Sequence, residues 1–299
     1  MKRIAQIILI ITSALFMMRC TPIDSSAKSI TVTIPPLKGI VNQIVGDDYE
    51  VNVLLPAGTS PETYSPTISQ LTAVSNSDYV FTIGTLNFEE SLVNSLKHNA
   101  NCRITNTSHG IYLIKGECNH THHHGEEAHS EHSEHHTHRH SIDPHVWMSH
   151  RGLLKIINNI TSALISNNPD SARYTTNAER LKGKVMAQIS AAELALASAP
   201  KSFLIYHPAL GYFAEEYGLE QISLEYEGKN PTPKSLAEIV EKVNNEGLRT
   251  LLYQQEYPED VVKPIADVLD VNLFQINPLS EDIIAELNRV INILSSGDE

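Results

Sequence analysis

Residues 30–55 read ITVTIPPLKGIVNQIVGDDYEVNVLL, and this stretch predicts a strand, a helix and a second strand. Residues 30–34 and 51–55 are short runs rich in β-branched side chains, whereas residues 37–45 have the apolar spacing of a helix. A strand, a helix and a strand in this order form a βαβ unit of a parallel sheet. The stretch therefore places the chain in the α/β class.

The alternation of strands and helices continues through the first half of the chain and restarts in the second half. In the first half, further strands are predicted at residues 79–83 and 102–105, with helices at 68–75 and 88–98. In the second half, strands are predicted at residues 202–206, 222–224, 250–254 and 271–276, with helices at 210–217, 234–245, 258–269 and 281–294. We therefore expect two lobes of parallel sheet with flanking helices, at residues 28–168 and 200–299.

A long helix is predicted between the two lobes, at residues 169–199. Its apolar positions recur at intervals of three or four residues, at Tyr174, Ala178, Leu181, Val185, Ile189, Ala192 and Leu196. Pro169 suits a first helical turn, and Pro200 ends the helix. About 30 residues at 1.5 Å each span roughly 45 Å, enough to run beside both lobes. We expect this helix to hold the lobes nearly rigidly; the alternative is a long surface helix of one large domain.

The overall composition excludes several classes of protein. The chain has 299 residues, 22 basic against 35 acidic side chains, and a formal net charge of −13. Proteins that follow nucleic-acid phosphates need a basic face, which this balance makes hard to assemble. Only one early stretch approaches the ~20 apolar residues of a membrane-spanning helix. We therefore expect no nucleic-acid partner and no multi-span membrane protein.

Residues 1–27 are predicted to be a secretory signal and a tether. Lys2 and Arg3 precede an apolar run at residues 4–18, and Cys20 follows it. Lipidation of Cys20, which would attach the mature chain to a membrane, is the favoured interpretation, although the preceding Arg departs from the usual small residue. Cleavage at the small residues 25–27 and a retained membrane helix are the alternatives. Both cleaved forms would lie in the periplasm or on the outer face of a membrane.

Either cleavage of the signal leaves Cys102 and Cys118 as the only free thiols. An even pair in an oxidising compartment favours a disulfide between them. The alternative is two unpaired thiols near a metal-rich loop, because pairing depends on a geometry that the sequence does not give.

Ten of the 15 histidines lie in residues 120–140, without apolar periodicity. Such a segment cannot bury a core, so we expect a disordered loop. Imidazole is the commonest neutral metal ligand, and this density predicts a weak, multivalent metal-collecting loop. The alternative is a low-complexity insertion that binds metal only incidentally. The predicted loop ligands are His120, His122, His123, His124, His129, His132, His135, His136, His138 and His140.

Three further residues are candidate metal ligands. His207 follows the predicted strand at residues 202–206, and ligand sites lie outside the carboxyl ends of such strands. His145 precedes a helical segment at an edge of the first lobe, and Glu62 lies in a loop rich in Pro and Gly after the strand at 51–55. Two imidazoles and a carboxylate suit Zn²⁺ or Mn²⁺. Taken singly, each residue is more often an ordinary structural or surface side chain, but the similar placement of His145 and His207, one per lobe beside the predicted metal-collecting loop, favours metal binding.

Four segments carry a more specific pattern. They are LPAGTSPETYSPT at residues 55–67, DPHVWM at 143–148, HPALGYFA at 207–214 followed by YGL at 217–219, and NPL at 277–279. With these segments, the His-rich segment and the long helix, the chain resembles the metal-specific solute-binding proteins of bacterial ABC importers, the zinc and manganese uptake group. The resemblance covers nearly the whole mature chain. It implies two lobes joined by a rigid helix, with one metal in the cleft between them.

The resemblance also implies the metal ligands. Its metal-binding positions correspond to Glu62, His145 and His207. Many relatives have His where this chain has Glu62, so the match there is imperfect. The fourth position, often acidic in the family, corresponds to Asn277, whose amide is a poor ligand.

The fourth ligand is therefore open at the level of the sequence. Water, binding of Glu62 through both of its oxygens, or a nearby acid such as Glu256 or Glu225 could complete the site. Zn²⁺ is the expected cargo because it suits two imidazoles and one carboxylate, and it also suits the His-rich segment. Mn²⁺ prefers more oxygen ligands and is the second choice.

The resemblance implies a binding protein without catalytic activity. We expect a monomer that captures the metal outside the cytoplasm and delivers it to an ABC permease driven by an ATPase. Imidazole binds metal only when neutral, so affinity should fall as the pH drops through about 6.5. The rivals are a zinc-dependent hydrolase that uses the same three residues, and a storage or adhesion lipoprotein. Against the hydrolase, the chain lacks His-Glu-x-x-His, Gly-x-Ser-x-Gly and Gly-x-x-x-x-Gly-Lys motifs.

Overall fold

The computed structural model describes residues 28–99, 102–116, 142–166, 172–225 and 229–296. The predicted signal segment, the ten histidines of residues 120–140 and Cys118 lie outside the described residues. Cys102 is buried and forms no disulfide with another described residue, and its pairing with Cys118 stays a prediction. Within the described ranges, no helix has the length and apolar character needed to cross a bilayer.

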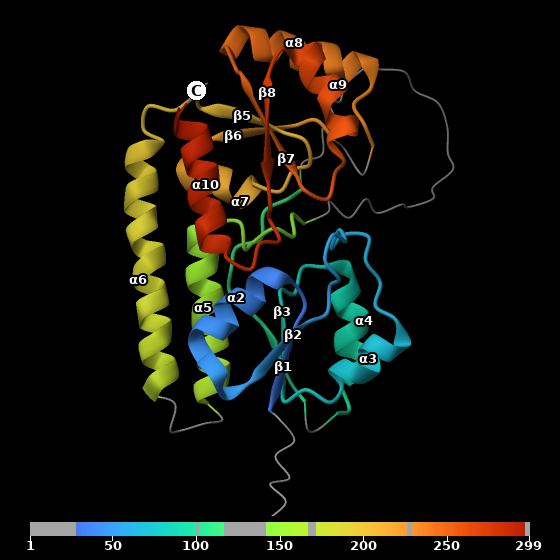
Figure 1. Ribbon diagram of the computed structural model, residues 1–299, viewed down its shortest axis with the longest axis vertical. Helices are drawn as coiled ribbons and strands as arrows, with labels where there is room; N and C mark the ends of the chain where they lie inside the picture. The colour runs from blue at the N-terminus through green and yellow to red at the C-terminus, as the bar shows by residue number, and fades with distance from the viewer. Residues whose placement is uncertain (1–27, 100–101, 117–141, 167–171, 226–228, 297–299) are drawn as a thin grey trace, which may run out of the picture.

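The first half of the chain forms a parallel sheet. Its elements are β1 (Ser29–Val32), α2 (Pro35–Val45), the 3-10 helix η1 (Gly46–Asp48), β2 (Glu50–Val53), α3 (Ile68–Val74), β3 (Tyr79–Thr82), α4 (Asn87–Leu96) and β4 (Arg103–Asn106). The strands are hydrogen-bonded in the order β2-β1-β3-β4. Helix α2 lies on one side of the sheet, with α3 and α4 on the other (Figure 1).

The second half repeats this arrangement. Its elements are β5 (Ser202–Ile205), α7 (Gly211–Tyr217), β6 (Glu220–Ser223), α8 (Pro233–Glu246), β7 (Thr250–Gln254), α9 (Glu259–Leu269), β8 (Asn272–Ile276) and α10 (Ile283–Ser296). The strands are again parallel, in the equivalent order β6-β5-β7-β8. Every strand predicted from the sequence overlaps an observed strand, and the expected fold class, two lobes of parallel sheet with flanking helices, is confirmed.

Two long helices lie between the two sheets in sequence, and the second of them runs beside both lobes (Figure 1). Helices α5 (His150–Ile165) and α6 (Ala172–Ala195) pack side by side, and α6 also contacts α2 and α10 (Figure 1). The helix expected at residues 169–199 overlaps α6, although α6 ends at Ala195 and residues 169–171 lie outside the described residues. Its buried positions, which include Leu181, Val185 and Ala192, follow the apolar spacing of the sequence. One helix therefore touches elements of both halves of the chain.

The strands of the second sheet separate two hydrophobic cores. Along β5, Phe203 and Ile205 face one core, whereas Leu204 and the following Tyr206 face the other, as expected for side chains that alternate across a sheet. The smaller core lies under α8 and α9. The larger core extends into the first lobe and includes α6 and α10. Although α10 follows the second sheet in sequence, its apolar face thus belongs to the core that joins the lobes.

The start of α5 is tied to the second lobe. The carboxylate of Glu216, on α7, accepts hydrogen bonds from the N–H groups of His150 at 2.8 Å and Arg151 at 3.2 Å. Ser149 caps the same helix end through its hydroxyl, which accepts from the Gly152 N–H at 3.1 Å. These contacts fix the segment before α5 relative to both lobes.

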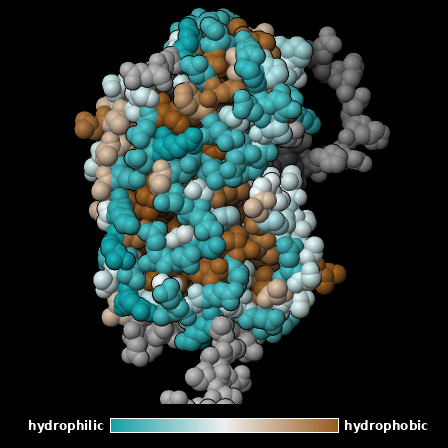
Figure 2. Space-filling view, viewed as in Figure 1, coloured by the Kyte–Doolittle hydropathy of each residue, from teal (hydrophilic) through white to brown (hydrophobic). Residues whose placement is uncertain are grey.

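The molecular surface shows no single broad apolar face in the view of Figure 2, where apolar residues appear in small separate areas among polar ones. The largest exposures of apolar side chains are at Ile68, Tyr112 and Leu194, which lie on different parts of the chain. Scattered exposure of this kind is usual for a globular protein.

Candidate metal centre

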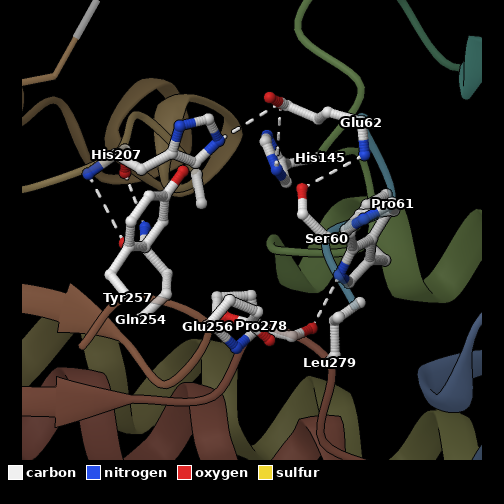
Figure 3. Close-up of a pocket in the computed structure, with 12 residues that line it drawn as sticks. Ser60, Pro61, Glu62, His145, His207, Gln254, Glu256, Tyr257, Pro278 and Leu279 are labelled. Atoms are coloured by element: carbon white, nitrogen blue, oxygen red, sulfur yellow. Dashed lines mark hydrogen bonds and ion pairs between the residues drawn. The ribbon is translucent and has the colours of Figure 1, made fainter. Parts of the chain in front are cut away.

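The loops at the carboxyl ends of both sheets enclose a pocket of about 30 Å³ (Figure 3). Several of its lining residues lie in the loops that follow β2, β5, β7 or β8. The carboxyl ends of parallel strands are where α/β sheets bind ligands. The lining residues are Ser60, Pro61, Glu62, His145, Trp147, His207, Ala209, Gln254, Glu256, Tyr257, Pro278 and Leu279.

Glu62 reaches the pocket from the loop after β2. The loop is fixed by Tyr64, whose hydroxyl donates to the Leu54 carbonyl at 3.1 Å and whose ring meets Phe88 edge-on, with 5.0 Å between ring centroids. The Glu62 N–H donates to Ser60 Oγ at 3.3 Å. The Glu62 side chain remains 37% exposed, so an ion arriving from solvent can reach its carboxylate.

His145 is held by a local motif. Asp143 Oδ1 accepts a hydrogen bond from the His145 N–H at 2.8 Å and lies 2.9 Å from its ring Nδ1. Two residues later, Trp147 Nε1 donates to the Pro278 carbonyl at 2.8 Å, which ties this segment to the second lobe. A carboxylate on Nδ1 assigns the proton to that nitrogen and leaves the lone pair of Nε2 for the pocket.

His207 is held by contacts between strands. It follows β5, and Glu225, which follows the neighbouring β6, places Oε2 2.5 Å from the His207 Nδ1. Gln254, at the end of β7, donates through Nε2 to the His207 carbonyl at 2.6 Å and accepts from its N–H at 3.4 Å. The Tyr257 ring lies against the imidazole, with 5.7 Å between centroids. As in His145, Nε2 is left facing the pocket.

The three predicted ligands meet at one point. The Glu62 Oε1 lies 3.2 Å from the His207 Nε2 and 3.9 Å from the His145 Nε2. One donor atom from each residue lies within 4.8 Å of the other two. Two ligands of one zinc ion, each bonded at roughly 2.0–2.2 Å, are at most about 4.4 Å apart. Small adjustments would therefore allow all three to bind one ion.

The pocket also sets the charge of its members. Burial tends to lower the pKa of His207, but the carboxylates of Glu225 and Glu62 outweigh this effect and raise it to about 9. Burial tends to raise the pKa of Glu62, but His207 and His145 outweigh it and lower the pKa. Without metal, His207 and Glu62 are therefore an ion pair near neutral pH. The pH window expected from an ordinary imidazole accordingly moves upward for His207.

Asn277 directly precedes two residues that line the pocket, and its own polar groups are engaged in its loop. Its Oδ1 accepts from the Leu279 N–H at 3.0 Å, and its N–H donates to Glu286 Oε1 at 2.7 Å. The residues after it, Pro278 and Leu279, line the pocket. Asn277 Oδ1, the atom that would bind a metal, is thus already hydrogen-bonded within the turn that places Pro278 and Leu279 at the pocket.

The two acids named as alternatives lie in different places. Glu225 contacts the outer nitrogen of His207, so its position is that of an orienting group behind a ligand. Glu256 lines the pocket itself, and its Oε1 is buried without a hydrogen-bond partner among the described residues.

Three contacting residues were not singled out by the sequence. Asp143 stands two residues before His145, and this spacing is a local signal that could have identified it. Gln254 and Tyr257 reach His207 only because β5 and β7 are neighbours in the sheet. No local pattern in the sequence records that pairing.

Comparison with known proteins places this geometry in a family. Residues 30–288 match the family described as zinc-uptake complex component A periplasmic, ZnuA. The chain is 27% identical over 289 residues to the zinc-binding lipoprotein AdcA of Streptococcus pneumoniae, a match that covers 93% of this chain and 56% of that protein. It is 25% identical over 261 residues to the high-affinity zinc uptake system protein ZnuA of Bacillus subtilis, covering 84% and 78%. The chain thus spans about half the length of the streptococcal relatives it matches.

The fold is shared with solved structures as well. A crystal structure of a ZnuA deletion mutant with zinc bound superimposes with a TM-score of 0.77 at 25% sequence identity, over 92% of this chain and 99% of that one. The family match runs from β1 through both sheets and ends in the first half of α10. The chain therefore belongs to the family of periplasmic zinc-uptake component A proteins, ZnuA.

Proposed function

We propose that this protein captures one Zn²⁺ ion between its two lobes and delivers it for import. The observation that carries this proposal is the convergence of Glu62, His145 and His207 within 4.8 Å of one another, from loops that are distant in sequence. The streptococcal and Bacillus relatives are described as zinc-binding and zinc-uptake proteins, which supports zinc as the cargo.

The donor set fits Zn²⁺ by its chemistry. Two imidazole nitrogens and one carboxylate oxygen are usual zinc ligands, and each imidazole has a carboxylate behind it that fixes the ring. Zinc binding would replace the proton on His207, because the metal needs the neutral ring. The ion would thus take the place of the proton beside the Glu62 carboxylate, and the ion pair between the lobes would become a shared metal site.

The transport partners follow from family membership. We infer that the protein gives its ion to an ABC permease driven by an ATPase, and that it acts as a monomer outside the cytoplasmic membrane. Lipidation of Cys20 would keep it at that membrane. The histidines of residues 120–140 would collect metal weakly and raise its concentration near the cleft.

Two other functions remain as alternatives. Mn²⁺ is the second candidate cargo, because a carboxylate in the donor set also suits it. A zinc-dependent hydrolase would use the same residues with a metal-bound water. Turnover of peptide, ester or phosphate substrates by the zinc-loaded protein would favour the hydrolase, whereas a storage or adhesion role predicts normal zinc uptake in cells that lack the gene.

Calorimetric titration of metal-stripped protein tests the proposal. Zn²⁺ and Mn²⁺ are added to residues 28–299, to the same chain without residues 120–140, and to the His207→Ala variant. We expect one tight zinc event that survives the deletion and is lost in His207→Ala. Loss of all zinc binding with the deletion would contradict the proposal. In that case, retained Mn²⁺ binding would indicate a manganese carrier.

A further inference from the structure

Glu256 carries a buried carboxylate oxygen that the contacts so far leave unexplained. It lines the pocket beside Pro278, on the wall opposite Glu62 (Figure 3). Its Oε1 is buried, and no described residue forms a hydrogen bond with it. Burying a carboxylate oxygen without a donor costs free energy, and native sites usually provide a water or an ion as the missing partner. We therefore expect a water or an ion in the pocket to be the missing partner of Glu256 Oε1.

The segment that carries Glu256 is held against His207. Gln254, two residues earlier, bonds to the backbone of His207, and Tyr257, one residue later, packs against its ring. Burial raises the pKa of Glu256, and this rise is opposed first by the residue's own backbone N–H and then by the nearby imidazoles of His207 and His145. The carboxylate is thus fixed at the pocket, within electrostatic range of both imidazoles.

Glu256 is nevertheless not placed to bind the same ion directly. Within the described part of the chain, the donor atoms that lie within 4.8 Å of one another come from Glu62, His145 and His207, and Glu256 is outside this group. Ligands of one zinc ion are at most about 4.4 Å apart. A cavity of about 30 Å³ has room for a water beside the ion, since a water needs roughly 10–15 Å³ of such volume.

We propose that Glu256 completes the metal site through a water molecule that is the fourth ligand of the ion and donates a hydrogen bond to the Glu256 Oε1. This inference rests on the proposed function, because it requires an ion at Glu62, His145 and His207. It explains the orphaned oxygen, and it explains how a fourth ligand is held while Asn277 is engaged in its own turn. Two carboxylates, Glu62 and Glu256, then balance the charge of a divalent cation bound by neutral imidazoles.

The test compares zinc affinities, measured by competition with a chelator, in the full mature chain. The variants are Glu256→Gln and Glu256→Ala, with Glu241→Gln, an exposed position on α8, as the control for loss of one carboxylate. Outer partners of metal ligands typically contribute about 10–100-fold to affinity. We expect a loss in that range for both Glu256 variants and a change of less than about twofold for Glu241→Gln.

Addition of formate separates a role in the pocket from a role in folding. Formate is a small carboxylate that fits the space left by Glu256→Ala, and we expect it to restore a large part of the lost zinc affinity in that variant alone. Wild-type affinity in Glu256→Gln would overturn the inference. Loss of affinity in Glu256→Ala without recovery in formate would also overturn it. If wild-type protein lacks tight zinc binding in the cleft, the proposed function itself fails, which is a separate result.

Discussion

The two histidines of the site are held in different ways. His145 in the first lobe is fixed by Asp143, two residues away, which bonds to both its backbone and its ring. His207 in the second lobe is fixed by Glu225 and Gln254, which are 18 and 47 residues away and follow or end neighbouring strands. One imidazole is thus positioned by its own loop, and the other by the packing of the sheet.

The difference indicates how each half of the site should respond to change. A local motif keeps its geometry as long as its short segment is folded, whereas contacts between strands depend on the register of β5, β6 and β7. The His207 ring also contacts one carboxylate from each lobe: Glu225 of the second lobe at Nδ1 and Glu62 of the first lobe at Nε2. We therefore expect the second-lobe histidine to be the one whose charge responds to metal.

The largest expected effect is the loss of either imidazole. His145→Ala and His207→Ala each remove a ligand, and each should weaken zinc binding by more than the ~10–100-fold expected for an outer partner. Competition with a chelator of known affinity measures the loss. If one of these variants kept wild-type zinc affinity, the histidine of that lobe would not be a ligand, and the two histidines could no longer be compared as parts of one site.

The next largest effect is expected from the carboxylates that contact the Nδ1 atoms of the two histidines. Asp143→Asn and Glu225→Gln should each lower zinc affinity by about 10–100-fold, because each ring loses the group that fixes its orientation. Only Glu225→Gln should also lower the pKa of His207, because Glu225 helps to raise it. NMR titration of the His207 ring in metal-free protein checks this difference. Equal shifts in both variants would contradict the proposed asymmetry.

The effect of pH should have opposite signs for affinity and stability. His207 in the metal-free fold has a pKa raised to about 9, above its ordinary value of 6.5. Its contribution to folding is therefore complete below about 6.5 and is lost as the pH rises through about 9. Zinc affinity should instead increase over this range, by up to about tenfold per pH unit, because one proton is displaced.

Thermal unfolding of metal-free protein and zinc competition, both between pH 6.5 and 9, measure the two trends. The His207→Gln variant is the control, and it should lose most of the pH dependence of stability in this window. An unfolding midpoint of wild-type protein that rises with pH over the same range would contradict the charge state assigned to His207.

The sequence predicted the fold better than it predicted the surroundings of the site. The strands and helices were recognisable because buried parallel strands are short apolar runs separated by helical patterns. Glu62, His145 and His207 were named as ligands from their places beside predicted elements and from the family resemblance, and the structure brings their donor atoms together. Gln254 and Glu225 as supports for His207 were not, because their roles depend on which strands are neighbours in the sheet. The same limit applies to the buried oxygen of Glu256.

The smallest expected effect comes from a residue of the second lobe that lies against Asp143, the residue that orients His145. Gly211, at the start of α7, lies so close to Asp143 that an added Cβ would be 2.4 Å from Asp143 Oδ2. Gly211→Ala must therefore displace Asp143, and we expect a loss of zinc affinity near the lower end of the range, about tenfold. Gly183→Ala on α6, where a Cβ meets nothing within 4 Å, is the matched control. Equal affinities in the two variants would show that Asp143 can move without affecting His145.

The most direct test of the account is a crystal structure of the zinc-loaded protein, with the ion located by anomalous scattering at the zinc edge. The account predicts one strong peak between the lobes, within about 2.0–2.2 Å of the Nε2 atoms of His145 and His207 and of a Glu62 oxygen. A zinc ion bound away from these three residues, or bound by one lobe alone, would contradict it.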